Sequence, residues 1–228
     1  PAIVDETADI EKAGRDCVLG HSFDNNVICV DEKEVIAVDA ITDRLKASMR
    51  AAGAVELPAS ELGRLEKVIF SKMAGPRGHA TVNRDFVGKN AELILRALGM
   101  PGGPEVKCIL VEVPQDHPLI WTEQMMPVLP ITRVQNVDEA IDLAIAAEGG
   151  NHHTAVMHSH NLGALSKMAR QCNCSIFVKN GRAVAGLGAG GEGFTSFTIA
   201  SPTGEGLTGP IQFSRWRRCT MVDHFRIT

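Results

Sequence analysis

Six cysteines are the first candidates for chemistry in this sequence, and Cys29 differs from the other five in what precedes it. Asp24, Asn25 and Asn26 lead up to it, and such residues form turns because their side chains hydrogen-bond nearby backbone groups. In a turn, backbone amides can point at the sulfur or at an oxyanion. A free thiol is mostly protonated at neutral pH, so a nucleophilic role requires stabilisation by an amide or a cation. For the other cysteines a buried, small apolar role is the usual one.

Two other side chains could act as acid, base or ligand-binding groups. Glu123 follows Trp121-Thr122 and stands just before a predicted strand. His153 lies at a helix-to-strand turn, and its unperturbed pKa near ~6.5 suits general acid or base catalysis. For Glu123 the pattern alone favours a solvated loop carboxylate, and for His153 it is equally consistent with a histidine that only caps its turn.

A metal site built on cysteine and histidine is a second possibility for this sequence. Cys172 and Cys174 are separated by one residue, and four histidines lie nearby: His152, His153, His158 and His160. Structural zinc sites usually place two to four residues between paired cysteines. The spacing therefore argues against a metal, and we predict none.

A glycine-rich segment at residues 188–193 (GAGGEG) satisfies the dinucleotide-binding pattern G-x-G-x-x-G. That pattern works when a strand leads in and a helix leads out, so that the helix N-terminus faces the pyrophosphate. Here the exit, residues 194–199, alternates like a strand. The sequence thus disfavours a Rossmann motif and leaves a glycine loop that a ligand or another backbone can approach closely.

The elements that must position these residues alternate between strand and helix. Predicted helices cover 8–20 (with Thr7 as N-cap), 40–52, 59–69, 90–98, 137–147 and 161–171, and predicted strands cover 35–38, 107–113, 128–134, 154–158 and 175–179. Such alternation indicates an α/β fold with a largely parallel sheet and right-handed crossovers. Residues 212–227 look extended, like a terminal strand or arm.

Composition is that of an ordinary soluble globular protein, with 228 residues, 44% hydrophobic, 22% charged and a net charge of -4. No apolar run approaches the ~20 residues of a membrane helix. The one basic run, residues 215–218, is too short to track phosphates, so nucleic acid is not expected as a partner. Six cysteines in a chain of this type indicate free thiols in a reducing cytoplasm. Pro1 and the four residues after it read like the middle of a strand, which suggests a fragment.

Four stretches, in order, carry a family resemblance. Residues 4–10 (VDETADI) with 21–29 (HSFDNNVIC), residues 123–130 (EQMMPVLP), His153-Thr154 and residues 185–206 (AGLGAGGEGFTSFTIASPTGEG) closely resemble CoA-acylating aldehyde dehydrogenases. Within that family the sequence is most similar to the propanediol- and ethanolamine-utilisation enzymes, which oxidise propionaldehyde or acetaldehyde inside bacterial microcompartments.

The resemblance implies the α/β catalytic half of such an enzyme, without its dinucleotide-binding half. Residues 1–20 would end a preceding helix or linker, 21–185 would form the catalytic domain, and 186–228 would form the glycine-rich loop and an extended oligomerisation arm. Cys29 would attack the aldehyde, with its own backbone amide binding the oxyanion. His153 would assist proton transfer or attack by coenzyme A (CoA), Glu123 would hold the nicotinamide ribose of NAD, and Gly188, Gly190 and Gly191 would contribute to cofactor binding.

The resemblance also implies a homodimer or tetramer, in the cytoplasm or the lumen of a microcompartment. The alternatives are an NAD(P)-dependent aldehyde dehydrogenase that does not use CoA, a non-enzymatic assembly domain, and a metal-binding domain.

Overall fold

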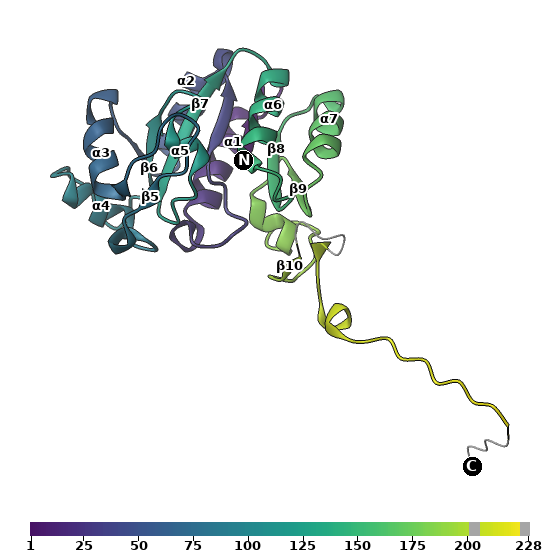
Figure 1. Cartoon of the computed structure of the whole chain (residues 1–228). Helices are drawn as coiled ribbons and strands as arrows, with labels where there is room; N and C mark the ends of the chain where they lie inside the picture. The colour runs from purple at the N-terminus through teal and green to yellow at the C-terminus, as the bar shows by residue number, and fades with distance from the viewer. Residues whose placement is uncertain (201–205, 224–228) are drawn as a thin grey trace.

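A computed structural model describes residues 1–200 and 206–223. Its centre is a seven-stranded parallel sheet in the order β3-β6-β7-β2-β1-β8-β9 (Figure 1). The strands are β1 (Ala2–Val4), β2 (Val35–Val38), β3 (Ala54–Glu56), β6 (Cys108–Glu112), β7 (Val128–Val134), β8 (Thr154–His158) and β9 (Ile176–Lys179). Every residue of the central strands β1 and β2 is buried, which explains their continuous apolar sequences: a parallel sheet is covered on both faces.

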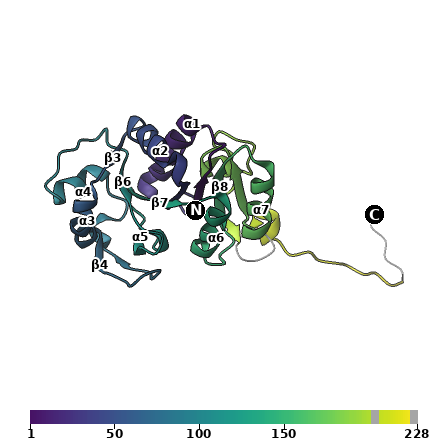
Figure 2. The same cartoon turned by 90° about the horizontal axis from the view of Figure 1, so that it is seen from above.

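Helices cover both faces of this sheet (Figure 2). Because β1-α1-β2 and β2-α2-β3 run in one direction along the sheet while β7-α6-β8 and β8-α7-β9 run in the other, right-handed crossovers place α1 and α2 opposite α6 and α7. The helices are α1 (Ile10–His21), α2 (Asp39–Ala51), α3 (Leu62–Ile69), α4 (Ala91–Ala97), α5 (Pro118–Trp121), α6 (Val137–Glu148) and α7 (Leu162–Cys172).

A smaller layer, separate from the seven-stranded sheet, packs against β6. The antiparallel pair β4 (Phe70–Lys72) and β5 (Thr81–Val82) joins α3 and α4 there. A second cluster of buried apolar side chains, including Leu65, Ile94 and Leu95, holds this layer against β6 and α5. This layer matters for the site because it supplies the contacts that anchor the loop before β2.

The α/β fold with a parallel sheet is confirmed, and so is each predicted strand to within a residue or so at its ends. Four details differ. Helix α1 begins at Ile10 and its N-cap is Asp9, whose side chain accepts from the Lys12 backbone N–H; the Thr7 hydroxyl binds the Asp5 carboxylate instead. A 3₁₀ turn at Ala59–Glu61 precedes α3, and residues 194–198 are not a strand. Several short elements of two to four residues were not predicted, among them strands β3, β4 and β5 and helix α5.

Residues 1–20 are part of the sheet domain rather than the end of a preceding helix or linker. Strand β1 pairs with β2 on one side and β8 on the other, in the middle of the sheet. The apolar residues of α1, among them Ile10, Ala13 and Cys17, lie in the same core cluster as β1. A boundary at residue 20 therefore does not divide the structure into separate cores.

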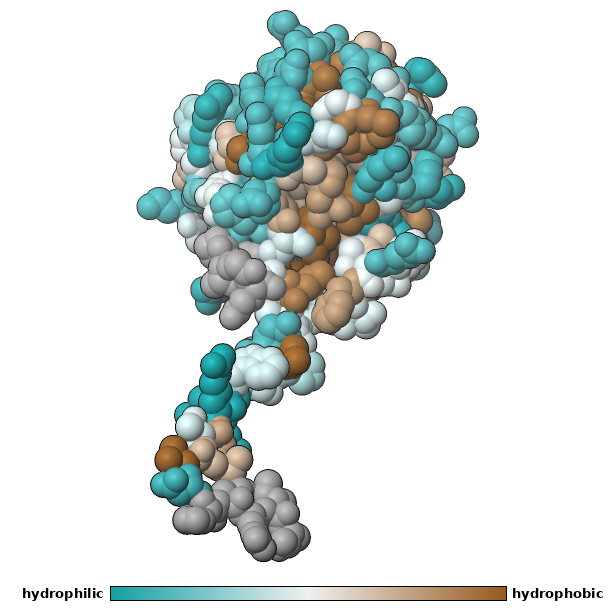
Figure 3. All heavy atoms as spheres, turned by 90° about the vertical axis from the view of Figure 1, so that its right-hand side faces the viewer, coloured by the Kyte–Doolittle hydropathy of each residue, from teal (hydrophilic) through white to brown (hydrophobic). Residues whose placement is uncertain are grey.

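After the short pair β10 (Ile199–Ala200) and β11 (Gly206–Leu207), a 3₁₀ turn at Pro210–Phe213 leads into a segment that projects from the body (Figure 1). Residues 214–223 form no helix or strand, in agreement with the predicted arm; residues 224–227 lie outside the described residues. Apolar side chains on this arm are exposed, including Phe213, Trp216 and Val222. Figure 3 shows a stripe of apolar surface on the part of the body next to this projecting segment.

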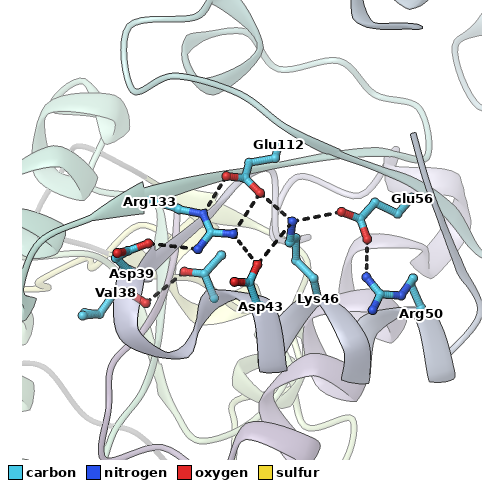
Figure 4. A network of polar contacts seen from close by, with 9 residues as sticks. Val38, Asp39, Asp43, Lys46, Arg50, Glu56, Glu112 and Arg133 are labelled. Carbon is cyan, nitrogen blue, oxygen red and sulfur yellow. Dashed lines mark hydrogen bonds and ion pairs between the residues drawn. The ribbon is translucent and has the colours of Figure 1, made fainter. Parts of the chain in front are cut away.

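A network of ion pairs lies at the carboxyl ends of the strands on the β3 side of the sheet (Figure 4). Arg133 on β7 contacts Glu112, Asp39 and Asp43, and Lys46 on α2 contacts Glu112, Asp43 and Glu56. These contacts tie α2 to three neighbouring strand ends. Among the described residues, no helix is both long and apolar enough to cross a bilayer.

Candidate active site

Three loops at the opposite edge of the sheet bring the predicted functional residues together. Cys29 lies in the loop that enters β2, Glu123 in the loop that enters β7, and His153 immediately before β8. Because these strands are parallel, their amino ends share one edge. All three residues line a single cavity of about 470 Å³. Open α/β sheets more often bind ligands at the carboxyl edge, which here holds the ion-pair network.

The loop before β2 has an unusual backbone. Asp24, Asn25 and Asn26 have φ of 45°, 54° and 66°, a left-handed conformation that Asn and Asp tolerate better than other non-glycine residues. The buried amide of Asn26 donates to the His21 carbonyl at 3.0 Å and to the Glu32 carbonyl at 3.1 Å. The predicted turn before Cys29 is thus present, and buried hydrogen bonds of Asn26 stabilise it.

Hydrogen bonds to another segment of the chain also stabilise this loop. The Asn25 amide donates to the Gly88 carbonyl at 3.1 Å and to Asn90 Oδ1 at 2.9 Å. Gly88 in turn donates its N–H to the Met125 carbonyl at 2.9 Å. The cysteine loop and the Glu123 loop therefore contact the same segment between β5 and α4.

Cys29 has an exposed thiol. Its partial burial raises the pKa of this thiol, and the nearby Glu123 and Asp31 carboxylates act in the same direction. Its own backbone N–H and the Lys33 ammonium lower the pKa of Cys29. An amide and a cation, the two kinds of stabilisation that the nucleophilic role requires, therefore both act on the thiol, but burial outweighs them and the pKa of Cys29 is raised on balance.

Glu123 extends from a loop that is otherwise fixed. Its side chain is 53% exposed, and one oxygen lies 3.3 Å from Lys33 Nζ. The flanking residues are anchored, because the buried Gln124 amide donates to the Leu119 carbonyl at 2.6 Å and the Thr122 hydroxyl accepts from the Ala80 N–H at 2.9 Å. Because its loop is anchored, the Glu123 carboxylate can accept hydrogen bonds from a ligand in the cavity.

His153 is half-buried at the start of β8. Its backbone N–H donates to Glu148 Oε1 at 2.9 Å, and its Nδ1 lies 2.8 Å from the Thr154 hydroxyl. Burial lowers the pKa of the His153 imidazole, although Glu123 and Glu148 oppose this effect. The lower pKa favours the neutral ring, which is the form that can accept a proton.

Two buried carboxyl groups beside Cys29 were not singled out from the sequence. Asp31 is 3% exposed and neither of its carboxylate oxygens has a hydrogen-bond partner among the described residues. Burial raises the pKa of Asp31 to about 8 and that of Glu32 to about 7. Glu32 Oε1 accepts from the Ala183 N–H at 2.8 Å and so joins the cysteine loop to the start of the glycine-rich segment. Only spatial neighbours reveal these environments, so no sequence pattern would have found them.

The three glycines predicted to bind cofactor do not line the cavity around Cys29. Gly188 and Gly190 have φ near 90°, which favours glycine, and a Cβ on Gly191 would meet the Ala185 side chain at 2.9 Å. Local backbone packing thus accounts for glycine at these positions. The helix that a dinucleotide-binding motif needs after its glycines is absent from the described residues 194–200.

The cysteine and histidine cluster does not assemble as a metal centre in the described part of the chain, where no group of three or more potential ligands is found. Cys172 and Cys174 are close, with 3.1 Å between their sulfur atoms. His152, however, uses Nδ1 for the Cys172 carbonyl at 2.9 Å.

Comparison with known proteins gives one consistent result. The model of the aldehyde dehydrogenase family matches residues 1–197. Acetaldehyde dehydrogenase (acetylating) EutE of Salmonella typhimurium is 50% identical over 227 residues, which cover 100% of this chain and 48% of that protein. The propanal dehydrogenase (CoA-propanoylating) of Citrobacter freundii is 46% identical over 228 residues, which again cover 100% of this chain and 48% of that protein.

A solved structure agrees with these relatives. The propionaldehyde dehydrogenase of Rhodopseudomonas palustris, with bound CoA and an acylated cysteine, superposes with a TM-score of 0.89 at 48% identity, covering 97% of this chain and 49% of that one. The chain spans about half the length of the curated relatives it matches. From the family model and these relatives together, the chain belongs to the aldehyde dehydrogenase family.

Proposed function

We propose that this chain is the catalytic half of a CoA-acylating aldehyde dehydrogenase, which converts acetaldehyde or propionaldehyde, NAD and CoA into acyl-CoA, NADH and a proton. The observation that carries the proposal is the meeting of Cys29, Glu123 and His153, from three distant stretches of sequence, in one cavity. Relatives at 50% and 46% identity with acetylating and propanoylating activities support this substrate class.

Cys29 is the nucleophile in this proposal. Its sulfur attacks the aldehyde carbon, and the carbonyl oxygen becomes an alkoxide stabilised by the Cys29 backbone N–H. Loss of hydride from that carbon gives a thioester on Cys29. Attack by the CoA sulfur then releases acyl-CoA and restores the Cys29 thiolate, a thiol exchange that needs no strongly activated water.

NAD supplies the hydride acceptor when bound. The residues present fit such a ligand, because Glu123 offers a largely exposed carboxylate at the cavity that contains the Cys29 sulfur, and a carboxylate accepts hydrogen bonds from both hydroxyls of a ribose. We assign Glu123 to that contact. Gly188, Gly190 and Gly191 remain proposed for cofactor or CoA contacts outside this cavity.

His153 is proposed to take the proton from the incoming CoA thiol. Its Nδ1 is engaged with Thr154, so Nε2 is the nitrogen for this transfer. Burial lowers the pKa of His153 and so favours the neutral imidazole, the form that this transfer needs. Because a structural neighbour comes from a fucose-utilisation bacterial microcompartment, we also propose the cytoplasm or a microcompartment lumen as the location. We further propose that the protein is a homodimer or tetramer that assembles through the arm.

The proposal is tested by joining this chain to the amino-terminal half of EutE and measuring NADH formation with each aldehyde, with and without CoA. We expect acyl-CoA as the product. The Cys29→Ala variant should lose at least about a thousandfold in rate, because it lacks the group that forms the covalent intermediate.

The matched control is Cys219→Ala, which removes another exposed thiol and should leave the rate unchanged. Equal rates for Cys29→Ala and wild type would contradict the proposal. NADH formation with free acid as the only product would identify an aldehyde dehydrogenase that does not use CoA.

A further inference from the structure

Lys33 contacts both the cysteine loop and the Glu123 loop of the candidate site, and the proposed function assigns it no role. Its side chain is 14% exposed. The ammonium group donates to the Asn26 carbonyl at 2.9 Å, to Asn26 Oδ1 at 3.1 Å and to the Ile28 carbonyl at 3.1 Å. It also lies 3.3 Å from Glu123 Oε1. A lysine has three N–H donors, so all of them are committed to the cysteine loop and the Glu123 loop.

The contact with Ile28 has a direct consequence for Cys29. The Ile28 carbonyl and the Cys29 N–H belong to the same planar trans peptide, so they point in opposite directions. Holding that carbonyl toward Lys33 therefore turns the Cys29 N–H away from it. A second donor, the Asp31 N–H at 3.1 Å from the Ile28 carbonyl, reinforces this orientation.

The charge of Lys33 acts on the same loop. Within the described part of the chain, the largest charge effects on the Cys29 sulfur come from Lys33, Glu123 and Asp31, and Lys33 is the cation of these three. By pairing with Glu123 it also offsets the carboxylate that most opposes a thiolate at Cys29. Without the ammonium, the negative charge of Glu123 would act on the Cys29 sulfur with no compensation from Lys33.

We propose that Lys33 is a positioning residue of this site: it fixes the Ile28–Cys29 peptide, favours the thiolate of Cys29 and holds Glu123 at the cavity. The inference rests on the proposed role of Cys29 as nucleophile. It differs from a role in folding alone, because it requires the reactivity of one particular thiol to depend on the charge at residue 33.

The test is the rate at which iodoacetamide alkylates Cys29 between pH 6 and 10, followed by peptide mapping, in wild type, Lys33→Met, Lys33→Gln and Lys33→Arg. Loss of the charge in the Met and Gln variants should move the midpoint of the Cys29 profile up by about one pH unit. The rate at pH 7 should then fall about tenfold, since only the thiolate reacts. Arginine keeps the charge and should restore most of the rate.

Two controls separate this effect from a general loss of structure. Lys46 is buried to a similar extent and contacts three carboxylates at the other edge of the sheet, so Lys46→Met should leave the Cys29 profile unchanged. Cys219 in the arm is exposed and serves as an internal reference, since its alkylation should be the same in every variant. If Lys33→Met does not fold, Lys33→Gln, which keeps a hydrogen-bond donor without the charge, gives the result.

An unchanged Cys29 profile in the folded Gln or Met variant would overturn the inference, as would an equal shift in Lys46→Met. The proposed function fails on a different observation, namely full activity of Cys29→Ala in the joined enzyme. The two failures are distinguishable because alkylation requires neither NAD nor CoA.

Discussion

At the scale of single residues, Asp31 gives the clearest prediction about pH. Its pKa is raised by burial to about 8, above the usual value of 3.8. The folded state therefore holds the proton more tightly than the unfolded state, and the resulting stability is present at low pH and lost as pH rises from about 4 to about 8.

The Asp31→Asn variant should remove that pH dependence. We expect the free energies of unfolding of variant and wild type to agree near pH 4, and the variant to be more stable by about 5 kcal/mol near pH 9, because the pKa of Asp31 lies about four units above its usual value and each unit is worth about 1.4 kcal/mol. Urea unfolding at the two pH values measures this difference. Asp116→Asn, at an exposed carboxylate, is the control and should show no such change; a variant less stable than wild type at pH 9 would contradict the assignment.

The sequence allowed part of the site to be predicted at this scale. Cys29 could be singled out because turn-forming residues precede it, and the local side-chain-to-backbone hydrogen bonds of such residues can be predicted from sequence. Lys33 and Asp31 could not, because their roles depend on burial and on Glu123, which is ninety residues away in the chain. The glycine pattern G-x-G-x-x-G indicates a dinucleotide site only with a following helix, and none follows in residues 194–200, so a role of these glycines in cofactor binding stays a prediction.

At the scale of elements, the site depends on where loops enter the sheet. Cys29, Glu123 and His153 each precede a strand, and strands of a parallel sheet begin at the same edge. The sequence therefore contained the information that these residues share an edge. It did not contain the strand order that puts β7, β2, β1 and β8 side by side, because that order depends on long-range packing.

The ion-pair network at the other edge gives a prediction about stability (Figure 4). Arg133 contacts three carboxylates and is 27% exposed, and its hydrogen bonds lower the pKa of Glu112. Arg133→Met should destabilise the fold by about 1–3 kcal/mol, because Glu112, Asp39 and Asp43 would repel one another with less compensation. Urea unfolding at low salt measures this loss, which should shrink as salt screens the repulsion.

Arg96→Met is the matched control for this network. Arg96 makes a single pair with Glu92 four residues away and its side chain is 72% exposed, so its loss should cost less than about 0.5 kcal/mol. Equal costs for the two arginine variants would show that the network adds nothing beyond isolated surface pairs.

At the scale of the whole molecule, the arm stands out because its large apolar side chains do not pack against the rest of the fold. Trp216 on the arm is 88% exposed, and large apolar side chains exposed in this way often mark an interaction surface. Deleting residues 210–228 should leave the free energy of unfolding within about 0.5 kcal/mol, since few of the arm's contacts are buried. It should also convert the proposed dimer or tetramer into monomers.

Sedimentation measures this assembly directly. A Trp216→Ser variant of the complete chain is a milder test that keeps the length of the arm. An unchanged assembly state after the deletion would show that the arm is not the oligomerisation segment.

The most direct test of the central account, that this chain forms an acyl-transfer site around Cys29, is to incubate it with propionyl-CoA and map the modified peptide by mass spectrometry. The exchange needs no NAD: the Cys29 thiolate displaces the CoA thiolate from the propionyl carbon. We predict one propionyl group per chain, on Cys29, and slower transfer in His153→Asn. Propionylation spread over several thiols, or its persistence in Cys29→Ala, would contradict the account.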